Sequence, residues 1–230
     1  MPRRRRARFG WTALTGIVVL VAAAGAHGQQ DPLCPYFAGC EFEAPGFTIR
    51  VVDERTGEPV SDAHVMAIWI VYGMYGRKGP IMTLEAVSGS DGTVTFPAWG
   101  PLRGGSTGLE PGHDPAISVF KPGYRTLFVI NPTPVGQLLV RVHPFRRADQ
   151  SFTLVPFQGT AAETIAELRK AAYSLPYPST GTLQEIRDAY VHRYRRVRAE
   201  LERLPRDTEV SRFLRRLDEE IQAYRTGGDR

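Results

Sequence analysis

A nearly unbroken apolar run from Ala63 to Tyr72 places the strongest constraint on the fold. Its sequence, AHVMAIWIVY, is rich in β-branched and aromatic residues, which are enriched in strands. A half-exposed strand alternates apolar and polar residues, whereas a strand covered on both faces does not. The run therefore predicts a central strand that is buried on both faces.

Short apolar segments separated by turn residues continue on both sides of this run, from Phe47 to about Pro156. This spacing is typical of a β-sandwich or barrel. No helix of sandwich-crossing length falls between the segments, which argues against a parallel α/β sheet. We expect seven or eight strands in all. Besides the central run they are Phe47–Val52, Ile81–Val87, Thr93–Phe96, Ile117–Phe120, Thr126–Ile130, Leu138–His143 and Ser151–Val155.

Two connections between these strands have distinct compositions. Asp91-Gly92 accepts positive φ angles at low cost, so Ser88–Gly92 predicts a tight hairpin that leads directly into the return strand Thr93–Phe96. The stretch from Trp99 to Pro115 is rich in Gly and Pro and has little apolar content, so we expect a long surface loop there.

The sequence period changes to that of helices after Thr160. Capping-box patterns at Thr160–Glu163 and Thr182–Glu185 predict two helix starts, and a third helix follows Pro205. The second and third helices predict an αα-hairpin whose apolar stripes face each other or the sandwich. The stripe positions are Leu183, Ile186, Tyr190, Tyr194, Val197, Leu201, Leu204, Val210, Phe213, Leu214, Leu217, Ile221 and Tyr224.

The N-terminus has the pattern of a cleaved signal peptide covering residues 1–28. Five arginines precede an apolar stretch from Leu14 to Gly25, and small residues follow it. An uncleaved membrane anchor is the alternative, but the apolar stretch is shorter than a spanning helix requires. The sequence thus predicts export to the periplasm or outside the cell, with membrane contact only through this segment if it is retained.

Removal of the signal segment balances the charge of the chain. Five of the 29 Lys and Arg residues lie in this segment and no acidic residue does, so 24 basic and 24 acidic residues remain. A balanced chain gives no general electrostatic reason to bind nucleic acid. In an oxidising compartment the close pair Cys34 and Cys40 is expected to form a disulfide.

Four segments follow one another between Ile49 and Tyr124: Ile49–Asp53, Thr56–Val65 (TGEPVSDAHV), Ser90–Phe96 (SDGTVTF) and Lys121–Tyr124 (KPGY). Together they resemble the carboxypeptidase regulatory-like domain, a transthyretin-like (prealbumin-like) family. The resemblance implies a Greek-key β-sandwich over residues 47–157, which follows an N-terminal segment (29–46) and precedes an α-helical tail (160–226). Such modules commonly serve as accessory, scaffolding or binding domains.

The sequence offers no catalytic, cofactor-binding or metal-binding pattern. The histidines of the mature chain, His64, His113, His143 and His192, lack ligand spacing, and we expect His64 and His143 to be edge or surface residues. A basic stretch on the second helix is expected to be a solvated helix face; it comprises Arg193, Arg195, Arg196 and Arg198.

The stretch from Trp99 to Pro115 is the best candidate for binding, because long loops on rigid sandwiches often contact partners. Its candidate ligand-binding residues are Trp99, Arg103, Glu110, His113 and Asp114; a plain connector is the alternative. We expect an exported non-enzymatic binding or scaffolding module with a protein or glycan partner and no cofactor. An envelope assembly component whose helical hairpin pairs with another chain is the alternative, and a small hydrolase is a weaker one.

Overall fold

The computed structural model describes residues 40–73, 76–104, 110–111, 115–129, 149–176 and 183–226. Within these ranges the protein is mainly β, with ten strands in three sheets and three helices. The strands are β1 (Cys40–Ala44), β2 (Phe47–Asp53), β3 (His64–Gly73), β4 (Gly76–Val87), β5 (Thr93–Phe96), β6 (Trp99–Gly104), β7 (Glu110–Pro111), β8 (Ala116–Phe120), β9 (Leu127–Val129) and β10 (Ser151–Leu154). The helices are α1 (Ala161–Tyr173), α2 (Gln184–Leu201) and α3 (Thr208–Thr226).

The larger sheet has the order β4-β3-β8-β9, and β7 pairs with the far end of β3. A three-stranded sheet has the order β10-β2-β5, with β10 parallel to β2, and β1 and β6 form a separate two-stranded sheet. The large and three-stranded sheets enclose one apolar cluster, to which β2 contributes Ile49 and Val51 and β3 contributes Val65 and Ala67.

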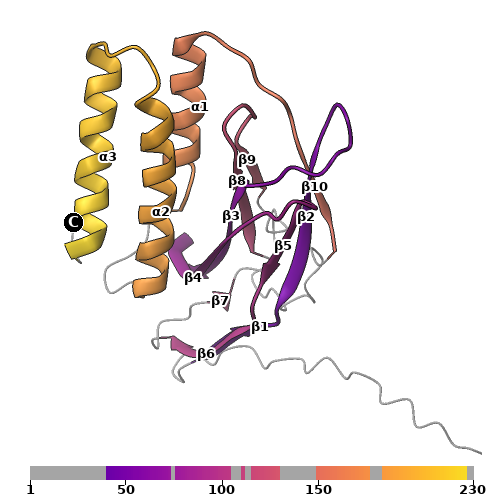
Figure 1. Ribbon diagram of the computed structural model, residues 1–230. Coiled ribbons are helices and arrows are strands. Elements are labelled where there is room, and N and C mark those ends of the chain that lie inside the picture. Colours follow the sequence, from indigo (N-terminus) through magenta and orange to yellow (C-terminus); the bar gives the residue numbers. More distant parts are fainter. Residues whose placement is uncertain are drawn as a thin grey trace, which may run out of the picture.

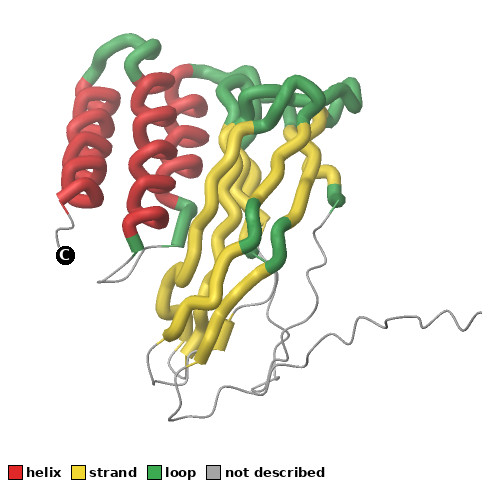
Figure 2. The backbone as a smooth tube through the Cα atoms, turned by 60° about the horizontal axis from the view of Figure 1, so that its bottom comes forward, coloured by secondary structure: helices red, strands yellow, loops and turns green. Residues whose placement is uncertain are grey.

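Helices α1 and α2 cover the opposite face of the large sheet, and α3 packs against α2. Figure 1 shows α1 and α2 beside β3, β4 and β8, and Figure 2 shows α3 farthest from the strands, which extend past the lower ends of the helices. A second apolar cluster joins Met66, Ile68 and Phe120 of the sheet to the helical stripes. The described part of the protein is therefore built in three layers: the three-stranded sheet (below, the small sheet), the large sheet and the helices.

The prediction of a central strand buried on both faces is confirmed by β3. It lies between β4 and β8, and residues 64–70 are all buried. Val65, Ala67 and Trp69 enter the cluster between the sheets, while Met66 and Ile68 enter the cluster beneath the helices. Because successive side chains of a strand point to opposite faces, an apolar run without alternation suits this position.

The prediction of a β4–β5 hairpin at Ser88–Gly92 is wrong, although the turn itself is present. Gly92 has a φ of 75°, as an Asp-Gly turn requires, but β5 pairs with β2 in the small sheet and β4 with β3 in the large one. The turn is bonded to the small sheet, since the Val51 N–H donates to the Gly92 carbonyl. It therefore carries the chain from one sheet to the other.

The prediction of a long loop from Trp99 to Pro115 is also wrong in part. Residues 99–104 form β6 against β1, and residues 110–111 form β7 against β3. The Trp99 ring packs edge-on against Trp69, with ring centroids 5.3 Å apart. This aromatic contact gives a Gly- and Pro-rich segment an anchor on the sheet.

The helix boundaries confirm one of the two predicted capping boxes. Thr160 caps α1, with its hydroxyl accepting from the Glu163 N–H and the Glu163 carboxylate accepting from the Thr160 N–H. The second predicted capping box includes Thr182, which lies outside the described residues. Helix α2 begins at Gln184, and its N-cap residue Leu183 makes no side-chain capping bond.

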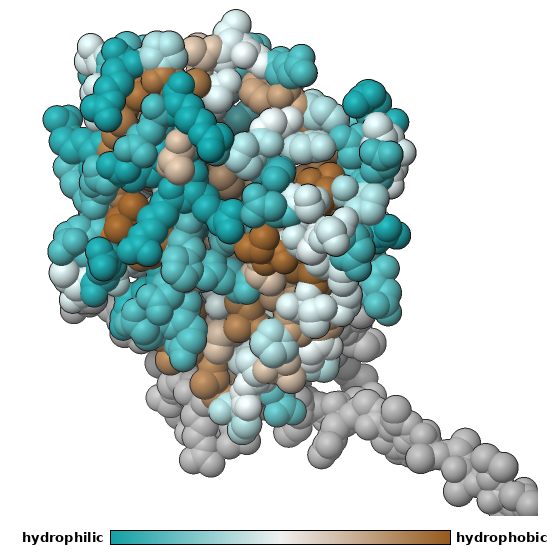
Figure 3. All heavy atoms as spheres, viewed as in Figure 1, coloured by the Kyte–Doolittle hydropathy of each residue, from teal (hydrophilic) through white to brown (hydrophobic). Residues whose placement is uncertain are grey.

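The apolar stripes of α2 and α3 are buried within the chain itself. Tyr190, Val197, Phe213 and Leu217 are each at most 3% exposed. Figure 3 accordingly shows a mostly hydrophilic outer surface over the helices, crossed by narrow apolar strips. The helices thus belong to the folded body. The predicted signal peptide 1–28, Cys34 and the predicted strand Leu138–His143 lie outside the described residues.

Candidate functional site

A cluster of polar side chains lies between α2 and the large sheet, where apolar residues otherwise fill the interface. On β4 and β8, Glu85 and Ser118 stand opposite Met66 of β3 and share its helix-facing side, as does His64 two residues earlier on β3. From the helical side, α2 contributes Arg193 to the same place. We call these four residues the interlayer polar cluster: His64, Glu85, Ser118 and Arg193.

Arg193 is the centre of the cluster and is fully buried, with 0% of its surface exposed. Its Nε donates to His64 Nδ1 (2.8 Å), and one terminal nitrogen donates to Ser118 Oγ (3.0 Å) and to the Ala171 carbonyl (3.5 Å). The other donates to the carbonyls of His64 and Ser118, both at 3.1 Å. A guanidinium has five N–H groups. Each has an acceptor here, and the acceptors lie on β3, β8 and α1.

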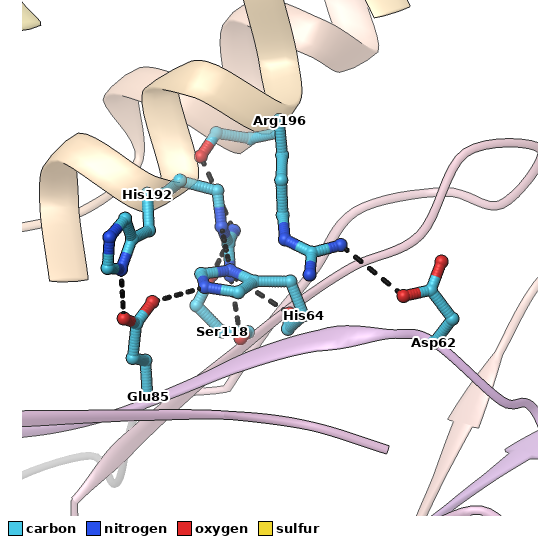
Figure 4. A network of polar contacts seen from close by, with 8 residues as sticks. Asp62, His64, Glu85, Ser118, His192 and Arg196 are labelled. Carbon is cyan, nitrogen blue, oxygen red and sulfur yellow. Dashed lines mark hydrogen bonds and ion pairs between the residues drawn. The ribbon is translucent and has the colours of Figure 1, made fainter. Parts of the chain in front are cut away.

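His64 connects the buried guanidinium to a carboxylate. Because Arg193 Nε can only donate, His64 Nδ1 must accept, which places the imidazole proton on Nε2. Nε2 then donates to Glu85 Oε2 at 2.6 Å. The other carboxylate oxygen, Oε1, contacts His192 Nδ1 at the edge of α2. Figure 4 shows Glu85 between the two imidazole rings.

The chain His192–Glu85–His64–Arg193 thus runs from the surface to the interior. The His192 side chain is 49% exposed and that of Glu85 26%, whereas His64 is 2% exposed. A buried cation needs a nearby countercharge or a dense set of dipoles. Arg193 has both, since three carbonyls bond it directly and the Glu85 charge is one imidazole away.

The protonation states follow from this geometry. Burial, reinforced by the Arg193 cation, lowers the pKa of His64 to about 4, so the ring is neutral at pH 7. Burial alone would raise the pKa of Glu85, but hydrogen bonds from His64 and His192 outweigh it and lower that pKa. Burial lowers the pKa of Arg193 to about 9, which leaves the guanidinium charged at neutral pH.

A second group of charges lies at the rim of the cluster. Asp62, which precedes β3 and has a positive φ of 53°, contacts Lys121 Nζ (3.3 Å) and a terminal nitrogen of Arg196 (3.5 Å). Arg196 lies one helical turn after His192 on α2, and Figure 4 shows it reaching down to Asp62. Helix α2 is therefore attached to the sheet by polar contacts at two adjacent places.

The chemistry open to this cluster is mainly that of holding and moving protons. His64 cannot act as a base toward a ligand, because Arg193 occupies its lone pair and the ring is buried. His192 contacts Glu85 through Nδ1, and its ring is half-exposed. His192 is therefore the accessible end of this series of hydrogen-bonded side chains. No group of three or more His, Cys, Asp or Glu suited to a metal ion occurs in the part of the chain that the structure describes.

The candidate binding residues predicted from the sequence lie elsewhere. His64 stands at the start of β3, whereas β7 pairs with Val71 and Tyr72 near its end, roughly 25 Å away at the rise of a β-strand. Arg103 lies in β6 opposite Glu41, and Glu110 lies in β7 opposite Tyr72. His113, Asp114 and the Cys34–Cys40 pairing fall outside the described residues, so these remain predictions.

Two predictions about individual residues are wrong. His64 is not an edge or surface residue, and Arg193 does not belong to a solvated helix face, since both are buried in the cluster. A sequence signal for each was present. His64 falls within the apolar run of β3, and position 193 falls on the α2 stripe, three residues after Tyr190 and four before Val197. His143 lies outside the described residues.

A groove with a volume of about 690 Å³ lies between α2 and α3. Charged side chains line most of it. Arg198 crosses it and is held by Asp218 and Glu202, both through contacts of 2.7 Å. The groove therefore shares no lining residue with the interlayer polar cluster, and its charged side chains form ion pairs of their own.

The described residues define a three-layer protein, mainly β, whose helices are joined to the sheet by a buried arginine. None of its described helices combines the length and apolarity needed to cross a membrane. No protein-family model, no curated protein and no solved structure matches this chain.

Proposed function

We propose that the protein is an exported, non-enzymatic binding or scaffolding module whose β body is a transthyretin-like Greek-key sandwich of the carboxypeptidase regulatory-like kind. Its partner is a protein or a glycan, which it contacts through the segment from Trp99 to Pro115. A rigid body that presents a tethered segment is a common arrangement for binding, because the body limits the entropy lost when a partner is bound.

The observation that carries this proposal is the attachment of that segment at two points. Strand β6 pairs with β1 at its beginning, and β7 pairs with β3 further along. The Trp99–Trp69 contact fixes β6 to the aromatic part of the core, where Trp69 also packs edge-on against Phe47. A plain connector does not need two such attachments, whereas a binding segment gains preorganisation from them.

Contacts between the motifs that resemble the family support the family assignment. Asp53 of the first motif accepts hydrogen bonds from the N–H groups of Arg55 and Thr56, at 2.8 and 2.9 Å, and so shapes the turn at Gly57. Its other oxygen accepts from the hydroxyl of Tyr124, in the last motif, at 3.0 Å. This bond gives the first and last motifs a shared structural role.

The envelope-assembly alternative has less support. It requires an apolar stripe on the helical hairpin that is free to pair with another chain. The stripes of α2 and α3 are instead buried against each other and the sheet. The surface of these helices that Figure 3 shows is mostly hydrophilic.

A binding experiment with substitutions in the segment tests the proposal. The full-length protein and an Arg103→Ala/Glu110→Ala variant would be immobilised and exposed to an envelope protein extract and to a glycan array. We expect the wild-type chain to retain a specific protein or glycan and the variant to lose it by at least tenfold. A matched control, Arg212→Ala/Glu219→Ala on α3, should bind like the wild type.

Equal binding by both variants and the wild type would contradict the proposal, as would binding lost only in the α3 control. Circular dichroism of each variant checks that it is folded, so that a loss of binding is not caused by unfolding.

A further inference from the structure

One of the polar contacts that attach α2 to the sheet requires an unprotonated nitrogen on a buried ring. Arg193 is the one α2 side chain in the interlayer polar cluster, and its Nε bond to His64 requires an unprotonated Nδ1. The remaining bonds of Arg193 go to neutral oxygens of β3, β8 and α1. A change at His64 Nδ1 therefore acts directly on the group that joins the layers.

We propose that the chain His192–Glu85–His64–Arg193 is a proton-operated latch, and that protonation of His64 at mildly acidic pH releases the attachment of α2 to the large sheet through Arg193. This inference concerns the helical layer and is independent of the proposed binding segment.

The geometry gives protonation a specific consequence. In the latched state His64 Nε2 already donates to Glu85, so an additional proton must go to Nδ1. That proton would point at Arg193 Nε, which is 2.8 Å away and is itself a donor. The hydrogen bond would be replaced by contact between two buried cations, which a low-dielectric site disfavours strongly. Withdrawal of Arg193 relieves the contact.

Charged groups from several elements surround the His64 ring. On β4, Glu85 favours a protonated ring; on α2, Arg193 and Arg196 oppose it, and His192 competes for the Glu85 carboxylate. Beyond the strand ends, Asp62 and Lys121 pair with each other, and Asp62 also pairs with Arg196. From α1 the contribution is the uncharged Ala171 carbonyl.

The ion pair between Asp62 and Arg196 should persist when the latch opens. Burial alone would raise the pKa of Asp62, but its contacts with Lys121 and Arg196 outweigh this and lower it, so the Asp62–Arg196 pair remains charged at pH 5. A proton on His192 also leaves its bond to Glu85 in place, since both nitrogens of a charged imidazole donate. The opening is therefore specific to the Arg193 attachment.

The direction of the pH dependence follows from linkage. The pKa of His64 is about 4 in the latched state and about 6.5 when the ring is released. A group with a depressed pKa in the closed state takes up a proton on opening, so the closed state loses stability as pH falls below 6.5 toward 4. His64 alone predicts an opening constant about 20-fold larger at pH 5 than at pH 7.

Hydrogen–deuterium exchange of the full chain at pH 7 and pH 5 tests the latch. After correction for the intrinsic exchange rate, we expect protection of the amides from Val191 to Val197 of α2 to fall by about 20-fold at pH 5. Amides from Ile49 to Val51 of β2 are the internal reference, because the small sheet does not contact the cluster, and their protection should change by less than about twofold.

Two variants identify the titrating group. In His64→Asn the side-chain carbonyl can accept from Arg193 and the amide can donate to Glu85, but no proton can be added, so the fall in α2 protection should disappear. In His192→Gln the exposed histidine is removed and the fall should remain. Should His64→Asn not fold, the wild type and His192→Gln still decide the question.

Three results would overturn the latch. The first is an unchanged protection of α2 in the wild type between pH 7 and pH 5. The second is an equal fall in the β2 reference, which would mean that the whole protein is destabilised. The third is a fall that vanishes in His192→Gln or persists in a folded His64→Asn variant.

Discussion

At the scale of single residues, Arg193 is the most consequential side chain that we find. A fully buried guanidinium with an acceptor for each N–H group joins α2 to β3, β8 and α1. Buried charges of this kind are costly to bring into a core and more costly to disrupt once there, because removal of one partner leaves the others without bonds.

Replacement of this residue gives a direct prediction. Arg193→Met keeps an apolar side chain of similar reach but removes the guanidinium, which leaves three carbonyls, a hydroxyl and a ring nitrogen without their donors. We expect the free energy of unfolding at pH 7 to fall by about 3 kcal/mol or more. Urea denaturation measures it. Arg195→Met, two residues along on the exposed face, should change it by less than about 0.5 kcal/mol. Equal effects of the two substitutions would be inconsistent with a central role for Arg193.

Residue roles of this kind were the least predictable from the sequence. The stripe on α2 and the apolar run of β3 could both be identified, but Arg193 and His64 are 129 positions apart. A local pattern contains no information about such a pairing. The sequence therefore suggested a solvated arginine and a surface histidine, which are the ordinary positions of these residue types when no partner is known.

At the scale of elements, glycines that share a backbone conformation differ in what surrounds them. Gly57 and Gly92 have φ angles of 72° and 75°. A Cβ at Gly57 would meet no atom within 4 Å, whereas one at Gly92 would lie 2.4 Å from the Val51 carbonyl oxygen and 3.1 Å from Pro59 Cβ. The turn at Gly57 thus requires glycine only for its positive φ angle. The turn at Gly92 also requires the absence of a side chain.

This contrast predicts different costs for the same substitution. Gly57→Ala should lower the free energy of unfolding by about 1 kcal/mol, the strain of a left-handed alanine. Gly92→Ala should lower it by about 3 kcal/mol, because the strain is joined by a clash with the backbone of β2. Thermal or urea denaturation of the pair measures both values. Equal losses would show that the turn at Gly92 adjusts freely, against the close packing described.

The sequence predicted the secondary-structure elements better than the roles of single residues. It predicted the pairing of the strands less well than the elements themselves. The central strand, the Asp-Gly turn and the capped start of α1 depend on neighbours in the sequence, and the structure confirms each. The partner of β5 and the strands within the segment from Trp99 to Pro111 depend on distant contacts, with β2, β1 and β3. These were predicted incorrectly, because a turn composition fixes a chain reversal but not the sheet that receives the next strand.

At the scale of the whole molecule, the helices and the β body share the large sheet. Strand β3 sends alternate side chains to the two clusters, so neither cluster is complete without it. Residues 47–157 and 160–226 were predicted as separate regions from their change in sequence period. The packing joins them, and the interlayer polar cluster adds directional bonds to that joint.

The central claim, that the helices and the sheets form one folded body, is tested most directly by urea unfolding at pH 7.5 followed with two probes. Far-UV circular dichroism reports the helices, and fluorescence reports Trp69 and Trp99 of the β body when Trp11 is replaced by Phe. The account predicts coincident transitions with one midpoint. Loss of the helical signal at a clearly lower urea concentration than the tryptophan signal would contradict it.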